Sequence, residues 1–122
     1  RSGPDSPYCW YIDPLDGTTN FAHTYPHFAV SIALAYESKI IVGVVHDPLR
    51  NETFCASRNG GAYLNGNPIH VSSAAQLDQS LLLTGFPYDR RRGSAFYLHY
   101  YEAFMLRTHG VRRSGSTALD LC

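Results

Sequence analysis

The chain has 122 residues, of which 44% are hydrophobic and 16% are charged, and its formal net charge is zero. This composition is typical of one small globular domain, spanning residues 1–122, and excludes an intrinsically disordered chain. Because there is no net positive charge, no overall field attracts the chain to nucleic acid or to an anionic membrane, and we predict neither partner.

Three cysteines, Cys9, Cys55 and Cys122, occur without CxxC spacing. This odd number argues against a disulfide framework and against a zinc site, and it predicts free thiols in a reducing, cytoplasmic compartment. No hydrophobic run reaches the roughly 18 residues that a membrane-spanning helix needs.

The predicted elements begin with strands. Residues 8–12 are aromatic and β-branched and predict a strand that ends before Pro14. Residues 28–36 and 40–48 predict an antiparallel hairpin with a short loop at 37–39. The second of these strands is rich in Ile and Val, so we expect it to be buried on both faces.

Shorter strands are predicted next, separated by turns that contain Gly and Asn. Their predicted ranges are 53–57, 62–64, 69–72 and 80–86. Together with one helix, they predict an α/β or α+β fold with a mostly antiparallel sheet.

That helix is predicted over residues 93–108. Tyr97, Tyr101 and Phe104 recur there at i, i+4 and i+7, which indicates a stripe that packs against the core. The pair His109-Gly110 is the predicted helix end. The preceding basic run, residues 90–92, is interpreted as a solvated loop.

The two ends predict that the chain is the central piece of a longer protein. The sequence opens on the polar stretch RSGPDSPYC and closes on ALDLC. In ALDLC, the spacing of Leu119 and Cys122 is typical of the first turn of an amphipathic helix. We therefore expect a domain that is incomplete at both ends.

The stretch Asp13-Pro14-Leu15-Asp16 predicts a metal site. Pro14 favours the second position of a tight turn whose end Cα atoms lie within about 7 Å, so the two carboxylates converge. Converging carboxylates repel unless a cation lies between them, and Mg²⁺ prefers oxygen ligands. The carbonyl of Leu15 is a further oxygen in this turn.

The next residues predict a phosphate site. Gly17 lets the backbone approach a ligand, and Thr18, Thr19 or Asn20 can cap a helical turn whose N–H groups favour an anion. An alternative interpretation treats the whole stretch as an ordinary surface turn.

Other polar residues are given simpler interpretations. None of the six histidines is predicted to be a metal ligand, although His23 and His27 are placed at the rim of the pocket. Asp47 stands at a strand end before Pro48 and is interpreted as a turn residue.

The sequence DPLDGTTNF, from Asp13 to Phe21, closely resembles the hallmark of the inositol monophosphatase family, D-P-[IL]-D-G-[ST]-[ST]-N-F. The segments FAVSIAL, GVVHDP, NGGAYLNG, TGFPYD and RRSGSTALDLC resemble further family segments in the same order. The resemblance implies an alternating α/β layered sandwich of the inositol monophosphatase and fructose-1,6-bisphosphatase type. It also implies a homodimer that needs two or three Mg²⁺ ions and is sensitive to Li⁺.

The resemblance implies a role for each matching residue. Asp13 would bridge two Mg²⁺ ions, with the carbonyl of Leu15 on one of them. Asp16 would bind the second ion and face the substrate hydroxyls. Gly17 and Thr18 would donate backbone N–H groups to phosphate, and the Thr18 hydroxyl would orient the attacking water. Catalysis would thus rest on Asp13, Asp16 and Thr18.

The second segment that the resemblance marks lies near the end of the chain. Gly115, Ser116 and Thr117 match residues that line the family's polyol pocket. They would complete a substrate site that residues 15–18 begin.

The family's other metal-binding acids come from an upstream Glu-Glu loop and a downstream Trp-Asp segment. This chain has neither, and its single tryptophan is Trp10. We therefore expect the isolated chain to be inactive.

The predicted function is Mg²⁺-dependent hydrolysis of myo-inositol monophosphate to inositol and phosphate. Three alternatives stay open: a phosphatase for another sugar, polyol or histidinol phosphate, a non-catalytic module that binds metal and phosphoester, and a plain structural domain.

Overall fold

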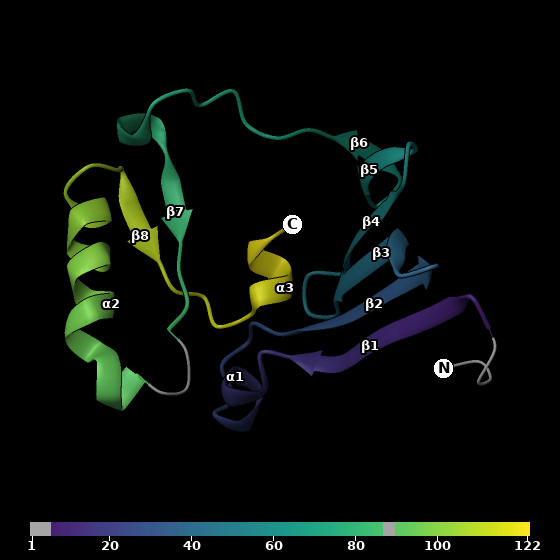
Figure 1. The fold of residues 1–122 in the computed structure, drawn as a ribbon, viewed down its shortest axis with the longest axis horizontal. Helices are drawn as coiled ribbons and strands as arrows, with labels where there is room; N and C mark the ends of the chain where they lie inside the picture. Colours follow the sequence, from purple (N-terminus) through teal and green to yellow (C-terminus); the bar gives the residue numbers. More distant parts are fainter. Residues whose placement is uncertain (1–5, 87–89) are drawn as a thin grey trace. The chain divides into compact units, whose positions relative to one another are not determined.

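The computed structural model describes residues 6–86 and 90–122 (Figure 1). The chain divides into two compact units, of which the first comprises Arg1–Val71 and Gly115–Cys122 and the second comprises Ser72–Ser114. Residues 87–89, which end the TGFPYD segment, lie outside the described residues. The α+β class predicted from the sequence is confirmed, whereas the single domain stays a prediction.

The first unit is built on a six-stranded antiparallel sheet in which each strand pairs with the next one along the chain. Figure 1 shows these strands side by side in sequence order. The strands are β1 (Tyr8–Asp16), β2 (Ala29–Tyr36), β3 (Lys39–Asp47), β4 (Glu52–Ser57), β5 (Gly61–Leu64) and β6 (Asn67–Ile69).

Strand β1 is longer than the sequence predicted. It continues past Pro14, and its pairing with β2 shifts between Asp13 and Asp16, where Asp16 lies opposite Ala29. Among the described residues β1 is an edge strand, and proline is tolerated at edges and at irregularities of a ladder because it has no N–H to donate. The prediction that Pro14 ends the strand is therefore wrong.

Tight turns join the strands much as predicted. The β2–β3 hairpin closes through Glu37 and Ser38, both with positive φ (46° and 66°). Two positive φ values in succession are the geometry of a type I′ turn, which normally selects Asn or Gly. The β5–β6 turn has the same geometry at Asn65 and Gly66 and does follow that preference. The strand predicted over residues 69–72 lies earlier in the chain, because β6 covers Asn67–Ile69 and shares only Ile69 with the predicted range.

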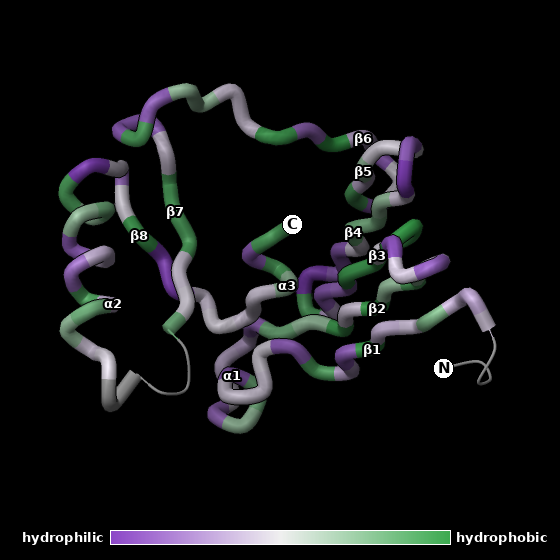
Figure 2. Tube along the Cα trace, viewed as in Figure 1, coloured by the Kyte–Doolittle hydropathy of each residue, from purple (hydrophilic) through white to green (hydrophobic). Residues whose placement is uncertain are grey.

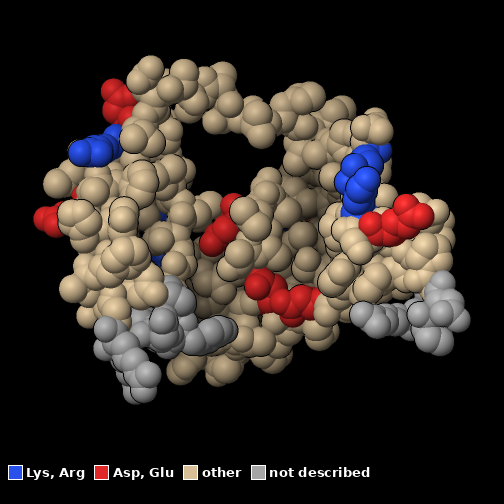
Figure 3. Space-filling view, viewed as in Figure 1, with Lys and Arg blue, Asp and Glu red and all other residues tan. Residues whose placement is uncertain are grey.

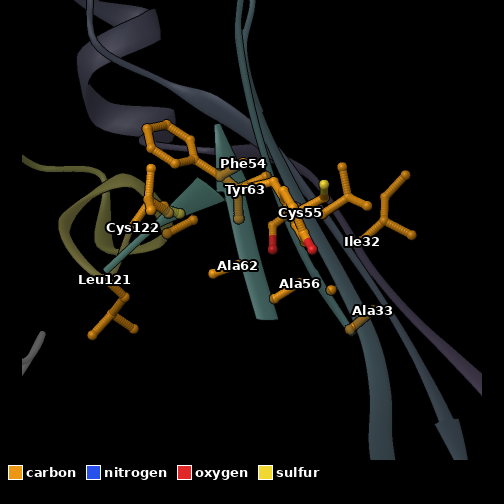
Figure 4. Close-up of a pocket in the computed structure, with 15 residues that line it drawn as sticks. Ile32, Ala33, Phe54, Cys55, Ala56, Ala62, Tyr63, Leu121 and Cys122 are labelled. Atoms are coloured by element: carbon orange, nitrogen blue, oxygen red, sulfur yellow. The ribbon is translucent and has the colours of Figure 1, made fainter. Parts of the chain in front are cut away.

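One face of this sheet carries an apolar cavity of about 350 Å³. Figure 4 shows Phe54, Cys55 and Tyr63 at this cavity, together with Leu121 and Cys122 from the end of the chain. Burial raises the pKa of the Cys122 thiol. Strand β3 also lines the cavity but is only partly buried, since Ile40 and Val42 are exposed. The prediction that this strand is buried on both faces is wrong.

Two short helices complete the first unit. Helix α1 (Thr18–Ala22) follows β1 directly, and α3 (Thr117–Asp120) lies near the end of the chain. The ALDLC stretch predicted as the start of a helix overlaps α3. Within the described part of the chain, no helix is both long and apolar enough to cross a membrane.

The second unit contains two paired parallel strands that are connected by a helix. Strand β7 (Leu81–Leu83), hydrophobic along its length in Figure 2, pairs with β8 (Gly110–Arg112), and the 3₁₀ helix η1 (Leu77–Gln79) precedes β7. Helix α2 (Arg90–Met105) forms the connection. Because a helix and not a hairpin joins the two strands, they can run parallel, unlike the antiparallel strands of the first unit.

Helix α2 begins and ends about three residues earlier than predicted. The basic run therefore belongs to the helix, and the prediction of a loop there is wrong. Gly93 has non-helical angles and marks a kink inside α2, while Gly110 starts β8 and does not cap the helix. The predicted packing stripe is observed in part, because the rings of Tyr97 and Tyr101 each lie 6.2 Å from that of Phe86.

Candidate functional site

The candidate site begins where β1 leaves its ladder. Between Asp13 and Asp16 the chain bends, and the backbone N–H of Leu15 donates to Oδ1 of Asp13 at 3.1 Å. This is the Asx-type bend that an Asp before Pro favours. The side chain of Asp13 is exposed and that of Asp16 is half-buried. Both carboxylates thus belong to one irregular strand end.

Gly17 connects this strand end to α1. Its φ is +85°, and it occupies the N-cap position of the helix with no side-chain capping bond. A Cβ on Gly17 would lie 3.0 Å from the carbonyl oxygen of His27 and 3.2 Å from Cα of Phe28. The prediction that Thr18, Thr19 or Asn20 caps the helix is wrong, because the left-handed backbone at this position requires glycine.

Asn20 ties the start of α1 to its surroundings. Its Nδ2 donates to the carbonyl oxygen of His27 at 2.8 Å. A Cβ on Gly115 would lie only 2.7 Å from the same Nδ2. Asn20 therefore packs directly against the second segment marked in the sequence, a contact that sequence reasoning missed.

The two marked segments also meet through Asp16. The hydroxyl of Ser116 donates to Oδ2 of Asp16 at 2.5 Å, and the backbone N–H of Ala118 donates to the same oxygen at 3.0 Å. Ser116 is completely buried, whereas Gly115 and Thr117 on either side of it are exposed. Residues about 100 positions apart in the sequence are thus joined within the first unit.

A second polar cluster lies at the β3–β4 turn. Asp47 is 1% exposed and accepts bonds from the backbone N–H groups of Leu49 and Arg50 and from the Arg50 guanidinium. Burial by itself would raise the pKa of Asp47, but these hydrogen bonds and the charge of Arg50 outweigh it and lower the pKa. The interpretation of Asp47 as a turn residue is confirmed.

Arg50 extends this cluster to His27, which sequence reasoning placed only at a pocket rim. Nη1 of Arg50 lies 3.3 Å from Nδ1 of His27. A guanidinium only donates, so Nδ1 must accept and the ring proton resides on Nε2. That Nε2 is buried and has no hydrogen-bond partner among the described residues. The Asp-Pro pair that opens the turn was the sequence signal for Asp47, but nothing local pointed to its link with His27.

The donors at the strand end fit a hard cation. The carboxylates of Asp13 and Asp16 and the carbonyl of Leu15 are all oxygen donors, which Mg²⁺ prefers over nitrogen and sulfur. Within the described ranges, no group of three or more His, Cys, Asp or Glu side chains is positioned to hold a metal. The strand end thus carries oxygen donors of the kind that bind Mg²⁺. Figure 3 shows basic and acidic side chains next to each other on the right of the view.

Comparison with known proteins agrees with the motif. The model of the inositol monophosphatase family matches residues 1–122. An inositol-1-monophosphatase from Synechocystis sp. is 54% identical over 120 residues, which cover 96% of this chain and 41% of that protein. The Nus factor SuhB from Pseudomonas aeruginosa is 48% identical, with 98% of this chain and 45% of that protein covered. The chain spans less than half the length of these relatives.

Solved structures share the fold. The inositol monophosphatase from Anabaena (Nostoc) sp. PCC 7120 superposes with a TM-score of 0.90 at 49% identity, covering 98% of this chain and 47% of that chain. The extragenic suppressor protein suhB from Bartonella henselae superposes with a TM-score of 0.91 at 43% identity, covering 98% and 46%. The predicted fold type is thereby confirmed.

Proposed function

The chain belongs to the inositol monophosphatase family, and we propose that the full-length protein is a Mg²⁺-dependent phosphatase that converts myo-inositol monophosphate to inositol and phosphate. The supporting observation is the contact between Asp16, at the end of β1, and Ser116, in the segment of residues 115–117. It joins a segment rich in oxygen donors to one built of small residues. A phosphomonoesterase needs both, one for metal and phosphate and the other for the alcohol.

Bound Mg²⁺ would lower the pKa of a coordinated water and stabilise the leaving oxygen. Asp13, Asp16 and the carbonyl of Leu15 are the residues that would hold it. The bond from Leu15 N–H to Asp13 fixes one oxygen of that carboxylate in the bend. Asp16 is held more firmly, because two donors meet on its Oδ2. These bonds would hold the carboxylate oxygens in place before an ion binds.

The residues after the acids would handle the phosphate and the alcohol. At Gly17 the absence of a side chain keeps the backbone close to residues 27 and 28 and fixes the direction of α1. The exposed Thr18 hydroxyl would orient the attacking water, and the N–H groups of Gly17 and Thr18 would bind the phosphoryl oxygens. Gly115 and Thr117 are exposed and small, which leaves room for a polyol ring.

The test is phosphate release from myo-inositol monophosphate by the full-length protein, measured with Mg²⁺ and with a chelator. Asp13→Asn removes one metal-binding charge at an exposed position and is expected to lower kcat/KM by well over tenfold, a change of about 1.4 kcal/mol per factor of ten. Asp78→Asn makes the same chemical change on the exposed helix η1 and serves as the control. Equal rates for the two variants would refute the assignment of Asp13.

A second candidate function is non-catalytic. It is favoured by the relative called Nus factor SuhB, which is 48% identical to this chain and whose name describes no phosphatase. A full-length protein that binds Mg²⁺ but releases no phosphate from a panel of sugar, polyol and histidinol phosphates would support this candidate. Release from another member of that panel, and not from inositol monophosphate, would leave a phosphatase with a different substrate.

Further properties implied by the family resemblance stay predictions. These are a homodimer, a cytoplasmic location and inhibition by Li⁺. The expected absence of nucleic-acid and membrane partners likewise stays a prediction.

A further inference from the structure

Ser116 is a completely buried polar residue at the centre of a hydrogen-bond chain. It is the N-cap of α3, and its Oγ accepts from the backbone N–H of Leu119 at 3.5 Å. The same Oγ lies 2.5 Å from Oδ2 of Asp16. An ionised carboxylate only accepts, so the single hydroxyl proton of Ser116 points to Asp16. The side chain therefore links a helix start to a carboxylate.

Both hydrogen bonds to Asp16 end on one oxygen. Ser116 Oγ and the backbone N–H of Ala118 meet at Oδ2, and within the described ranges no hydrogen bond reaches Oδ1 of Asp16. Rotation of the carboxylate would break both bonds at once. The two donors thus fix the orientation of the group and leave Oδ1 as the oxygen that is available to a cation.

We propose that Ser116 is a positioning residue that orients Asp16 for Mg²⁺ binding, an inference that rests on the proposed function. Complete burial keeps the Ser116 side chain away from a substrate, so this role differs from the polyol-lining role expected from the sequence. Partners that orient a metal ligand commonly contribute 10- to 100-fold to metal affinity, because they fix the ligand before the ion binds. Loss of the hydroxyl is therefore expected to weaken Mg²⁺ binding to that extent.

A purely structural role for Ser116 would be capping of α3, and two variants separate it from positioning. At an N-cap, Ser→Ala destabilises a helix more than Ser→Gly does. Ser116→Ala and Ser116→Gly therefore differ in their effect on stability but lose the same bond to Asp16. Ser116→Thr keeps the hydroxyl and is expected to keep the bond to Asp16. Ser73→Ala removes an exposed hydroxyl at a distant position in the sequence and serves as the control.

The measurement is calorimetric titration of the full-length protein with Mg²⁺ in the absence of substrate, with thermal melting of the metal-free protein alongside. The inference predicts about 10- to 100-fold weaker binding for both Ser116→Ala and Ser116→Gly, and near wild-type binding for Ser116→Thr and Ser73→Ala. Equal Mg²⁺ affinity in wild type and in either folded variant without the hydroxyl would overturn it. The inference would also be overturned if the loss of Mg²⁺ affinity among the variants correlated with their melting temperatures and not with the presence of the hydroxyl.

The outcome for the wild-type protein separates this inference from the proposed function. If wild type binds Mg²⁺ and releases phosphate while the Ser116 variants bind Mg²⁺ as tightly, only the role of Ser116 is refuted. If wild type itself binds no Mg²⁺, the proposed function and the inference both fail.

Discussion

Gly17 joins the acid-bearing strand end to α1, and the substitution Gly17→Ala tests how much of that junction depends on the missing side chain. The residue has a φ of +85°, which L-residues with a Cβ rarely adopt. An added Cβ would also lie 3.0 Å from the carbonyl oxygen of His27 and 3.2 Å from both Cα and Cβ of Phe28. Two of these three atoms are backbone atoms of the His27–Phe28 segment and cannot rotate away.

The expected cost has two parts. A left-handed conformation costs an L-residue about 1–2 kcal/mol, and forcing an extra methyl into a filled space costs about 1–3 kcal/mol. Against this, alanine restricts the unfolded chain and returns roughly 0.4–1 kcal/mol. Gly17→Ala should therefore lower the free energy of unfolding by about 2–4 kcal/mol.

Two other glycines separate these parts. Gly66 has nearly the same φ, +82°, but an added Cβ would meet nothing within 4 Å, so Gly66→Ala reports the backbone cost alone. Gly43, in β3, has neither a left-handed φ nor a close contact, so Gly43→Ala is expected to be neutral or slightly stabilising. The predicted order of stability is Gly43→Ala, then Gly66→Ala, then Gly17→Ala.

The assay is urea unfolding of the metal-free full-length protein, followed by circular dichroism, with midpoints and slopes compared among the three variants. If the Gly17→Ala variant is no less stable than the Gly66→Ala variant, the predicted steric cost at Gly17 is refuted. In that case the segment at residues 27 and 28 yields to the new methyl group, and the close approach at Gly17 is not a constraint.

Three further predictions concern Gly115, the pH dependence of stability at Asp47, and the isolated chain. Gly115→Ala should lower the free energy of unfolding by about 2 kcal/mol, because it adds left-handed strain and displaces the Asn20 amide from its hydrogen bond. A decrease no larger than that of Gly66→Ala would contradict this prediction. The lowered pKa of Asp47 means that its contribution to stability is present above about pH 4 and is lost as the pH falls through the lower folded-state value. The stability difference between wild type and Asp47→Asn, measured by urea unfolding from pH 6 to pH 2.5, should therefore shrink below about pH 4, and a constant difference would contradict it. The isolated 122-residue chain should release no phosphate from myo-inositol monophosphate above the buffer rate with Mg²⁺, because the family resemblance implies further metal-binding acids in segments that this sequence does not contain. Mg²⁺-dependent release would contradict this prediction.

The strand positions were predictable because their signals are local. Alternating β-branched and aromatic residues, interrupted by Gly and Asn, mark the hairpins of β2 to β5 within one or two residues. The β2–β3 turn shows where local signals fail, since Glu37 and Ser38 adopt positive φ values that their residue types disfavour. Pairing of the two strands compensates for the turn, and pairing is not a local property.

The strand end at Pro14 shows the same limit. Proline and the two flanking aspartates predict a turn, and a bend with an Asx-type hydrogen bond does occur there. However, the ladder resumes at Asp16, opposite Ala29. The turn signal was read correctly as a local bend, but only the neighbouring strand decides whether the sheet continues beyond it.

By itself, the sequence determined the chemistry that this chain brings to a site: oxygen donors at Asp13, Leu15 and Asp16, a glycine where the backbone must turn, and small residues near the other end. Only the tertiary structure decided that Ser116 donates to Asp16 and that Asn20 fills the space beside Gly115. These contacts join residues about 100 positions apart, so they cannot be predicted from hydrophobic periodicity or from turn residues, which are local patterns. They form because the 115–118 segment packs at the end of β1, which buries Ser116 and requires its hydroxyl to find a partner.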